Sequence, residues 1–294
     1  MADQPQCLFS GEPTQNEEHV IPRWMQRRYG LANQTYHLPN GSKIAYRNCK
    51  VPAAEAHNGR FGKIEERLAT GDATLQEIFL WALKVHIGLI FKDATLRTDI
   101  RNPAAGTFWD VEDFGQEVQL FRHLYEVWSN GGWFDPDPFG TVIVVDAITP
   151  NADFDFIHQL QSGTLFFQLG RQLIFVSLWD QAAGMSLNTE AILEHHRTVV
   201  AGMPEERRQE IGYVAQRTWA CETAYFLFRA RRAFAFAKTP TSMTLLSSLG
   251  RPSVRPPIEA ELASFSRSFG LRLAHFGGEV GNVFESWSPS HATA

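Results

Sequence analysis

Glu18 and His19 are adjacent in the stretch EEHVIP, which covers residues 17–22. A histidine can take a proton from water near neutral pH, and a neighbouring carboxylate can hold a divalent cation. The same pair also fits a plain surface turn, in which His19 is solvated and Glu18 is an ordinary exposed charge. Whether His19 is a general base therefore depends on what the fold places beside it.

Asn58 and Glu65 are the first candidates to lie beside His19 in the fold. They stand seven residues apart in the stretch 53–69, whose apolar spacing predicts a helix, so both side chains project from one helix face. His57 projects about 100° away, toward the apolar side of the helix. Two simpler interpretations stay open: Asn58 caps the helix start, and Glu65 is an exposed charge beside Glu66.

These residue types suit metal-assisted hydrolysis of a phosphodiester. The reaction needs a base to activate water and a cation to offset the charge that develops on the leaving oxygen. Carboxylate and amide oxygens favour Mg²⁺ or Mn²⁺ as that cation. A site that combined His19 and Glu18 with Asn58 and Glu65 would therefore hold the groups that this reaction needs.

Two stretches resemble the halves of the active-site motif of bacterial HNH endonucleases, also called His-Me finger or ββα-metal nucleases. They are CLFSGEPTQNEEHVIPRWM, which begins at residue 7, and YRNCKVPAAEAHNGRFGKIEE, which begins at residue 46. Weaker similarity extends over most of the chain. The resemblance implies a ββα-metal module in which His19 is the general base, Glu18 and Asn58 lie at the metal, and Glu65 supports or binds it.

The chain departs from that family at the zinc knuckle, the two CxxC pairs that would fall at residues 7–10 and 54–57. Ser10 replaces one cysteine, and Ala54 and His57 replace two others. Only Cys7 and His57 remain as candidate ligands, whereas a structural zinc needs four. We expect no structural zinc and a knuckle held by ordinary packing, which puts full catalytic activity in question.

Arginines follow the EEHVIP stretch directly. Arg23, Arg27 and Arg28 are the predicted phosphate contacts, since guanidinium groups bind phosphate well. The net charge of −5 gives no general attraction to nucleic acid, so binding requires such a local patch. The expected partner is DNA, with RNA as an alternative, and self-association stays open.

The predicted fold class is α+β, with an HNH-like module at residues 1–70 and an accessory α+β domain at residues 71–294. The accessory domain would position substrate, mediate self-association or sense a signal. The expected elements are strands at 18–22 and 42–51, the helix at 53–69, an amphipathic helix at 74–92, a helix at 111–128, an antiparallel meander of four strands at 141–180, helices at 188–201 and 205–237, and an irregular segment at 239–257.

Composition restricts the setting. Three cysteines form no disulfide framework, and the first residues show neither a basic segment nor an apolar run of the signal-peptide type. The apolar stretches are too short to span a bilayer, so we expect a cytoplasmic protein that uses no membrane. Besides a nuclease, two alternatives stay open: a catalytically silent HNH-like protein that binds nucleic acid or a partner protein, and a signal-gated defence effector.

Overall fold

The computed structural model describes residues 5–38, 42–99, 101–102, 104–149, 154–187, 189–230, 234–248 and 254–272. Helices and antiparallel sheets both build it, which confirms the α+β class. The chain divides into two compact units, Met1–Phe134 with Ala237–Thr244, and Asp135–Phe236 with Leu245–Ala294. The boundary predicted after residue 70 is not a boundary of these units, and the expected module is one part of the first unit.

The first unit begins with two small antiparallel sheets. β1 (Glu17–His19) pairs with β4 (Lys50–Pro52), and β2 (Thr35–His37) pairs with β3 (Lys43–Ala45). Helix α1 (Arg23–Arg28) follows β1. The single strand predicted at 42–51 is wrong, because its two halves belong to different sheets and the 3₁₀ turn η1 (Tyr46–Asn48) carries the chain from one to the other.

Two helices follow β4 directly. α2 (Glu55–Thr70) buries the predicted apolar stripe of Phe61, Ile64 and Leu68. α3 (Leu75–Asp93) starts at a capping box, in which the Glu77 backbone N–H donates to Thr74 Oγ1 and the Thr74 N–H donates to the Glu77 carboxylate.

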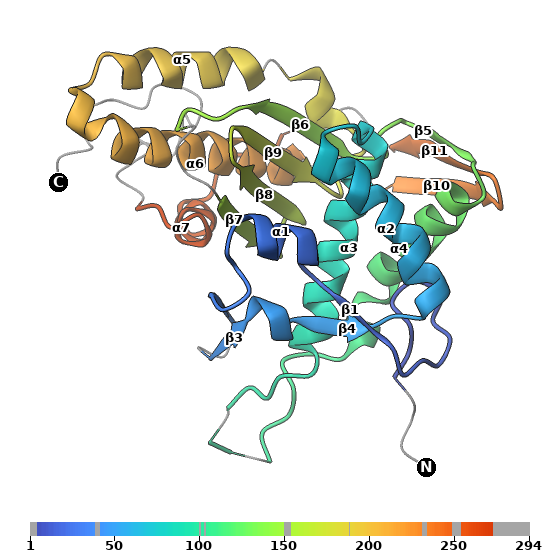
Figure 1. Ribbon diagram of the computed structural model, residues 1–294. Coiled ribbons are helices and arrows are strands. Elements are labelled where there is room, and N and C mark those ends of the chain that lie inside the picture. Colours follow the sequence, from blue (N-terminus) through green and yellow to red (C-terminus); the bar gives the residue numbers. More distant parts are fainter. Residues whose placement is uncertain are drawn as a thin grey trace. The chain divides into compact units, whose positions relative to one another are not determined.

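The expectation of an amphipathic α3 is wrong. The helix is buried on nearly all sides, because it contacts α2, α4 and β4 (Figure 1). α3 is therefore the central helix of the first unit.

The first unit also contains η2 (Val111–Phe114) and α4 (Gly115–Ser129), and the chain forms a further three-stranded sheet. The sheet has the order β10 (Phe234–Thr239), β11 (Ser242–Ser248), β5 (Trp133–Asp135). Both sequence expectations here are wrong, since 205–237 is not one helix and 239–257 is not wholly irregular. Small and bulky residues alternate in FAFAKT and favour a strand, and residues 231–233 and 249–253 lie outside the described ranges.

The second unit contains the large sheet, with β6 (Thr141–Asp146), β7 (Phe154–Gln159), β8 (Thr164–Leu169) and β9 (Gln172–Ser177). Its order is β6-β9-β8-β7, all antiparallel (Figure 1). The predicted meander holds for β7, β8 and β9, but β6 joins at β9 rather than at β7. Asp180, just after β9, accepts hydrogen bonds from Thr141 at the start of β6, which pins these two strands together.

Helices α5 (Thr189–Ala201), α6 (Glu205–Ala230) and α7 (Glu259–Ser268) complete the second unit, with the short turn η3 (Ala183–Ser186). α6 packs on β9 and α7 on β7. Trp219 of α6 meets Phe175 of β9 edge to face, with ring centroids 5.9 Å apart, in the middle of an apolar core. This unit thus has a hydrophobic core of its own.

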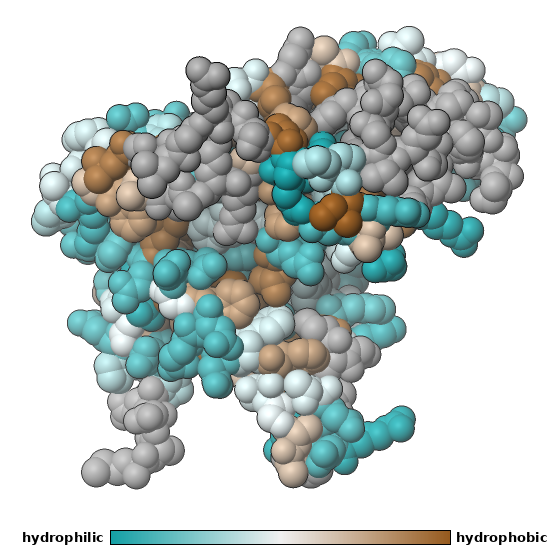
Figure 2. Space-filling view, turned by 180° about the vertical axis from the view of Figure 1, so that it is seen from behind, coloured by the Kyte–Doolittle hydropathy of each residue, from teal (hydrophilic) through white to brown (hydrophobic). Residues whose placement is uncertain are grey.

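Within the described ranges, no single helix combines the length and the apolar composition of a membrane span; α2 and α3 do so only as a pair bent by 116°. Among the residues that the structure describes, the exposed large hydrophobic side chains are Leu75, Trp133, Met185, Leu246, Val254 and Ile258. Figure 2 shows the face that is turned away from the viewer in Figure 1. Hydrophilic residues cover much of the described surface there, and hydrophobic residues form separate patches between them.

Candidate active site

Six side chains from three neighbouring elements surround a cavity of about 230 Å³ in the first unit. β1 supplies Glu17, Glu18 and His19, α1 supplies Arg23, and α2 supplies Asn58 and Glu65. We call it the acidic cavity. The structure therefore brings the neighbouring residues Glu18 and His19 together with Asn58 and Glu65, which lie much later in the sequence.

β1 holds Glu18 and His19 in a shielded position. Glu18 lies opposite Val51 and His19 opposite Lys50 in β4, and each of the two is only 8% exposed. The backbone N–H of Val20 extends the pairing by donating to Cys49 O at 2.9 Å. His19 is therefore not the solvated surface residue of the simpler interpretation.

α2 presents Asn58 and Glu65 to the cavity, as their spacing of two turns predicts. The N-cap of α2 is Ala54, and the Asn58 backbone N–H already donates to Ala54 O at 3.0 Å. Asn58 is thus inside the helix and does not cap it. The Glu65 side chain is 14% exposed and ion-paired, so it is not a free surface charge.

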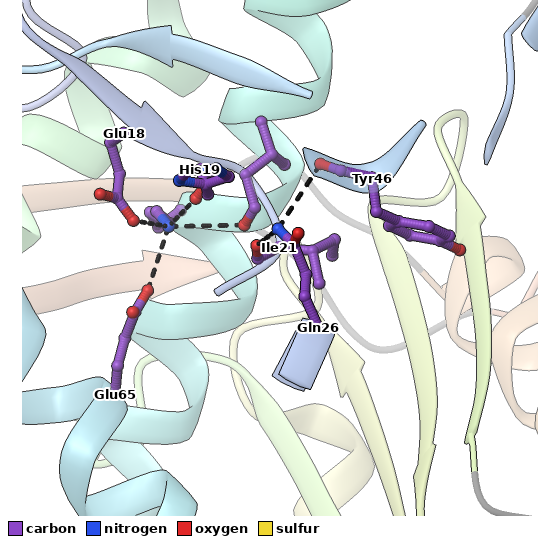
Figure 3. Close-up of polar contacts among 8 residues, drawn as sticks. Glu18, His19, Ile21, Gln26, Tyr46 and Glu65 are labelled. Carbon is purple, nitrogen blue, oxygen red and sulfur yellow. Dashed lines mark hydrogen bonds and ion pairs between the residues drawn. The ribbon is translucent and has the colours of Figure 1, made fainter. Parts of the chain in front are cut away.

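Lys84 of α3 is the ion-pair partner, and the sequence interpretation did not assign it to the site. Its ammonium donates to Glu18 Oε1 at 3.0 Å, to Glu65 Oε1 at 3.1 Å and to the backbone oxygen of His19 at 2.6 Å. In Figure 3 the carboxylates of Glu18 and Glu65 both point toward one nitrogen, to which dashed lines join them. A lysine in the middle of the apolar run IFLWALKVHIGLIF is the signal that points to it.

The backbone just after β1 depends on buried side chains for its hydrogen bonds. Lys84 Nζ also lies 3.4 Å from Val20 O, and Gln26 Nε2 donates to Ile21 O at 2.8 Å (Figure 3). A Cβ on Gly88 would come within 3.1 Å of the Val20 side chain, so glycine allows α3 to approach this segment closely. Three successive carbonyls after Glu18 are thus satisfied from within the fold.

The electrostatic surroundings favour a neutral His19. Burial lowers the pKa of His19, and the nearby charge of Arg23 lowers it further, while Glu18 opposes them. A neutral imidazole has a nitrogen lone pair free to accept a proton. The site therefore suits His19 to accept a proton at neutral pH.

The three arginines predicted to contact phosphate do not lie at one place in the structure. Arg23 lines the acidic cavity, whereas Arg27 and Arg28 do not line it and are exposed on α1. The Arg28 guanidinium lies over the ring of Trp24, 5.4 Å from its centroid. Arg23 is thus the arginine best placed to meet a phosphate in the cavity.

The region of the expected zinc knuckle is held by packing. Phe9 lies 5.2 Å from Phe61 and 4.9 Å from Tyr125 between ring centroids, and the hydroxyl of Tyr125 lies 3.1 Å from His57 Nδ1. Cys7 is fully buried, and its Sγ accepts a hydrogen bond from the Ala54 N–H at 3.2 Å. Cys7 and His57, the two remaining candidate zinc ligands, therefore both contact protein groups: the Ala54 N–H and the Tyr125 hydroxyl.

Arg122 of α4 completes this support. Its guanidinium donates to Cys7 O at 3.2 Å and to Leu8 O at 3.3 Å, which fixes the turn that follows Cys7. The same side chain lines a second cavity of about 580 Å³, together with Phe9, His57 and Arg60. Backbone carbonyls that a free knuckle would expose to water are thus held by a side chain.

The donor set of the acidic cavity fits one hydrated Mg²⁺ or Mn²⁺. Glu18 and Glu65 each use Oε1 for Lys84, which leaves Oε2 of each carboxylate and the Asn58 amide oxygen as hard donors. Mg²⁺ commonly binds through one or two carboxylates and keeps several waters. Within the described residues, no group of three His, Cys, Asp or Glu side chains is arranged to hold a metal ion, so a cation here would need water as a further ligand.

Comparisons with models of protein families, with curated proteins and with solved structures found nothing that matches this chain.

Proposed function

We propose that this protein is a metal-dependent endonuclease of the HNH type that hydrolyses DNA phosphodiester bonds in the acidic cavity. The observation that carries the proposal is the convergence of His19, Glu18 and Asn58 on one cavity. Their elements, an antiparallel strand pair followed by a helix, come in the order that the sequence resemblance implies. RNA is the alternative substrate.

Each side chain has a separate role in the proposed reaction. His19 accepts a proton from the water that attacks phosphorus, and Arg23 contacts a phosphate oxygen of the bound strand. Glu18 and Asn58 would hold one divalent cation, with Glu65 beside them. When bound, the cation offsets negative charge on the phosphate and the leaving oxygen.

Plasmid cleavage tests the proposal. Purified full-length protein is incubated with supercoiled plasmid and Mg²⁺ or Mn²⁺, with and without EDTA, and nicked and linear products are quantified. We expect cleavage that EDTA stops and that His19→Ala lowers roughly 10²- to 10⁴-fold. His37→Ala is the matched control, because His37 is exposed in β2 and does not line the cavity.

Cleavage that continues in EDTA would overturn the metal dependence. Equal cleavage by the wild type and His19→Ala would overturn the role of His19.

A catalytically silent protein that binds nucleic acid or a partner is the second candidate. Lys84 favours it, because a fixed ammonium already neutralises much of the carboxylate pair without an added cation. This candidate predicts that the wild type retards DNA in a gel with every metal tested but leaves the plasmid supercoiled. A signal-gated effector would instead cleave only after a ligand or partner is added.

We assign the protein to the cytoplasm, where a reducing environment keeps thiols free. Cys7, Cys49 and Cys221 are all free and buried, which supports this assignment. Self-association is a further proposal for this chain, and the acidic cavity is the place where its own residues would act. Substrate positioning, self-association and sensing remain the proposed roles for the residues after 70.

A further inference from the structure

Lys84 is a charged residue in an unusually apolar place. Its side chain is 0% exposed in the middle of α3, where its sequence neighbours Trp81, Leu83 and Val85 are fully buried. Taking an ammonium out of water costs several kcal/mol, so partners must compensate it. Here the compensation comes from two carboxylates and two backbone oxygens.

Stability alone does not explain a lysine at this position. Replacing a buried ion pair with apolar side chains of similar volume is often neutral or stabilising. All four acceptors of Lys84 belong to Glu18, Glu65 and the segment that carries His19. Each of these hydrogen bonds of Lys84 therefore goes to a residue of the acidic cavity or to the backbone beside it, although Lys84 does not line the cavity; its ammonium also lies 5.9 Å from the centroid of the Phe61 ring.

Charge counting shows what Lys84 does for that cavity. Two carboxylates and one ammonium give Glu18, Glu65 and Lys84 a combined charge of −1. Without the ammonium the charge would be −2, and the carboxylate oxygens that now face Lys84 would be free to bind a second cation. A fixed positive charge this close also weakens the binding of any added cation.

We propose that Lys84 is an internal cation and positioning residue of the active site, which orients Glu18 and the His19 backbone and limits the cavity to one external divalent cation. The positioning role of Lys84 rests on the proposed function. Its role as an internal cation concerns only the charges of Glu18, Glu65 and Lys84, so cation binding can test it without any reaction.

A charge series tests it by Mn²⁺ binding to the full-length protein, measured by calorimetry and by the electron paramagnetic resonance of free Mn²⁺. The combined charge is 0 in Glu65→Gln, −1 in the wild type, −1 in the double variant Lys84→Met/Glu65→Gln and −2 in Lys84→Met. We expect the Mn²⁺ affinity to rise in that order, with the wild type and the double variant within a few fold of each other. Lys84→Met should bind roughly tenfold more tightly than the wild type, or bind a second ion.

Glu66→Gln is the matched control, because Glu66 is exposed next to Glu65 and does not line the acidic cavity. Circular dichroism establishes which variants are folded. The double variant keeps the inference testable if Lys84→Met does not fold, since it leaves one buried carboxylate without the ammonium instead of two. Equal Mn²⁺ affinity in folded Glu65→Gln and the wild type would overturn the inference.

Plasmid cleavage separates this inference from the proposed function. If the wild type cleaves, Lys84→Met should cleave roughly 10²-fold more slowly at saturating Mn²⁺, because Glu18 and the His19 backbone lose their anchor. Unchanged cleavage would overturn the positioning role and leave the nuclease proposal intact. If the wild type does not cleave, a graded Mn²⁺ affinity across the series still supports the internal cation while the nuclease proposal fails.

Discussion

The two faces of α2 are held in different ways. One face carries Asn58 and Glu65 to the acidic cavity, where a buried charge, Lys84, fixes the carboxylates. The other face carries His57 and Phe61 into a cluster of aromatic rings around Phe9. The first face is held by directional hydrogen bonds and ion pairs, and the second face is held by the close packing of aromatic rings.

This difference separates chemistry from support within one helix. Side chains that line the acidic cavity should affect cleavage much more than stability, since they fill little of the core. Side chains around Phe9 should affect stability and leave the chemistry of the folded protein unchanged.

The largest effect should come from Phe9→Ala. Phe9 is 2% exposed among Phe61, Phe121 and Tyr125, so its removal leaves a cavity that costs about 3 to 5 kcal/mol of unfolding free energy. Urea unfolding measures this loss, and Phe9→Leu should recover much of it. A loss below about 1 kcal/mol would mean that packing around Phe9 does not hold the knuckle region.

Asn58→Ala and His57→Ala form a pair of neighbours with opposite expectations. Asn58→Ala should lower plasmid cleavage roughly 10²-fold and leave the melting temperature nearly unchanged, because the side chain lines the cavity and alanine suits a helix. His57→Ala should leave the cleavage rate of folded protein unchanged and cost about 1 kcal/mol, since the contact with Tyr125 is lost. The reverse outcome would exchange the roles of the two faces.

Asp93, at the end of α3, shows what a buried carboxylate does without a cation like Lys84. Burial raises the pKa of Asp93 to about 7, and its Oδ1 has no hydrogen-bond partner among the described residues. The folded chain therefore binds a proton more tightly than the unfolded chain, and stability falls as pH rises from about 4 to about 7 and then levels off.

Asp93→Asn should remove this slope. We expect the variant to be more stable than the wild type by on the order of 4 kcal/mol at pH 8 and by little at pH 4. Urea unfolding at a series of pH values measures the difference. Parallel curves for the two proteins would show that Asp93 does not titrate in this range.

The smallest effect should come from Cys7→Ala. The substitution removes the sulfur that accepts from the Ala54 N–H and leaves that donor without its partner, at a cost of about 1 kcal/mol. Cys7→Ser should cost no more, because its hydroxyl oxygen also accepts a hydrogen bond. Thermal unfolding of the wild type and both variants, with and without EDTA, measures the change; a melting temperature that EDTA lowers in the wild type but not in the variants would mean that Cys7 binds a metal.

The sequence predicts the local elements of the site better than it predicts their support. The spacing of Asn58 and Glu65 fixes a shared helix face, because helix geometry is local. The partner of β6 and the break between β3 and β4 depend on pairing between distant strands, which periodicity does not encode. Lys84 was missed for a similar reason: its partners are 19 and 66 residues away in the sequence.

Gly88 and Lys84 lie one turn apart on α3, and both act on the segment that follows His19. A fragment that stops at residue 70 would keep every residue of the recognisable motif, yet Glu18 and Glu65 would lack the Lys84 ammonium that binds both of them. The shortest fragment that keeps the site intact therefore extends through α3, well beyond the sequence motif.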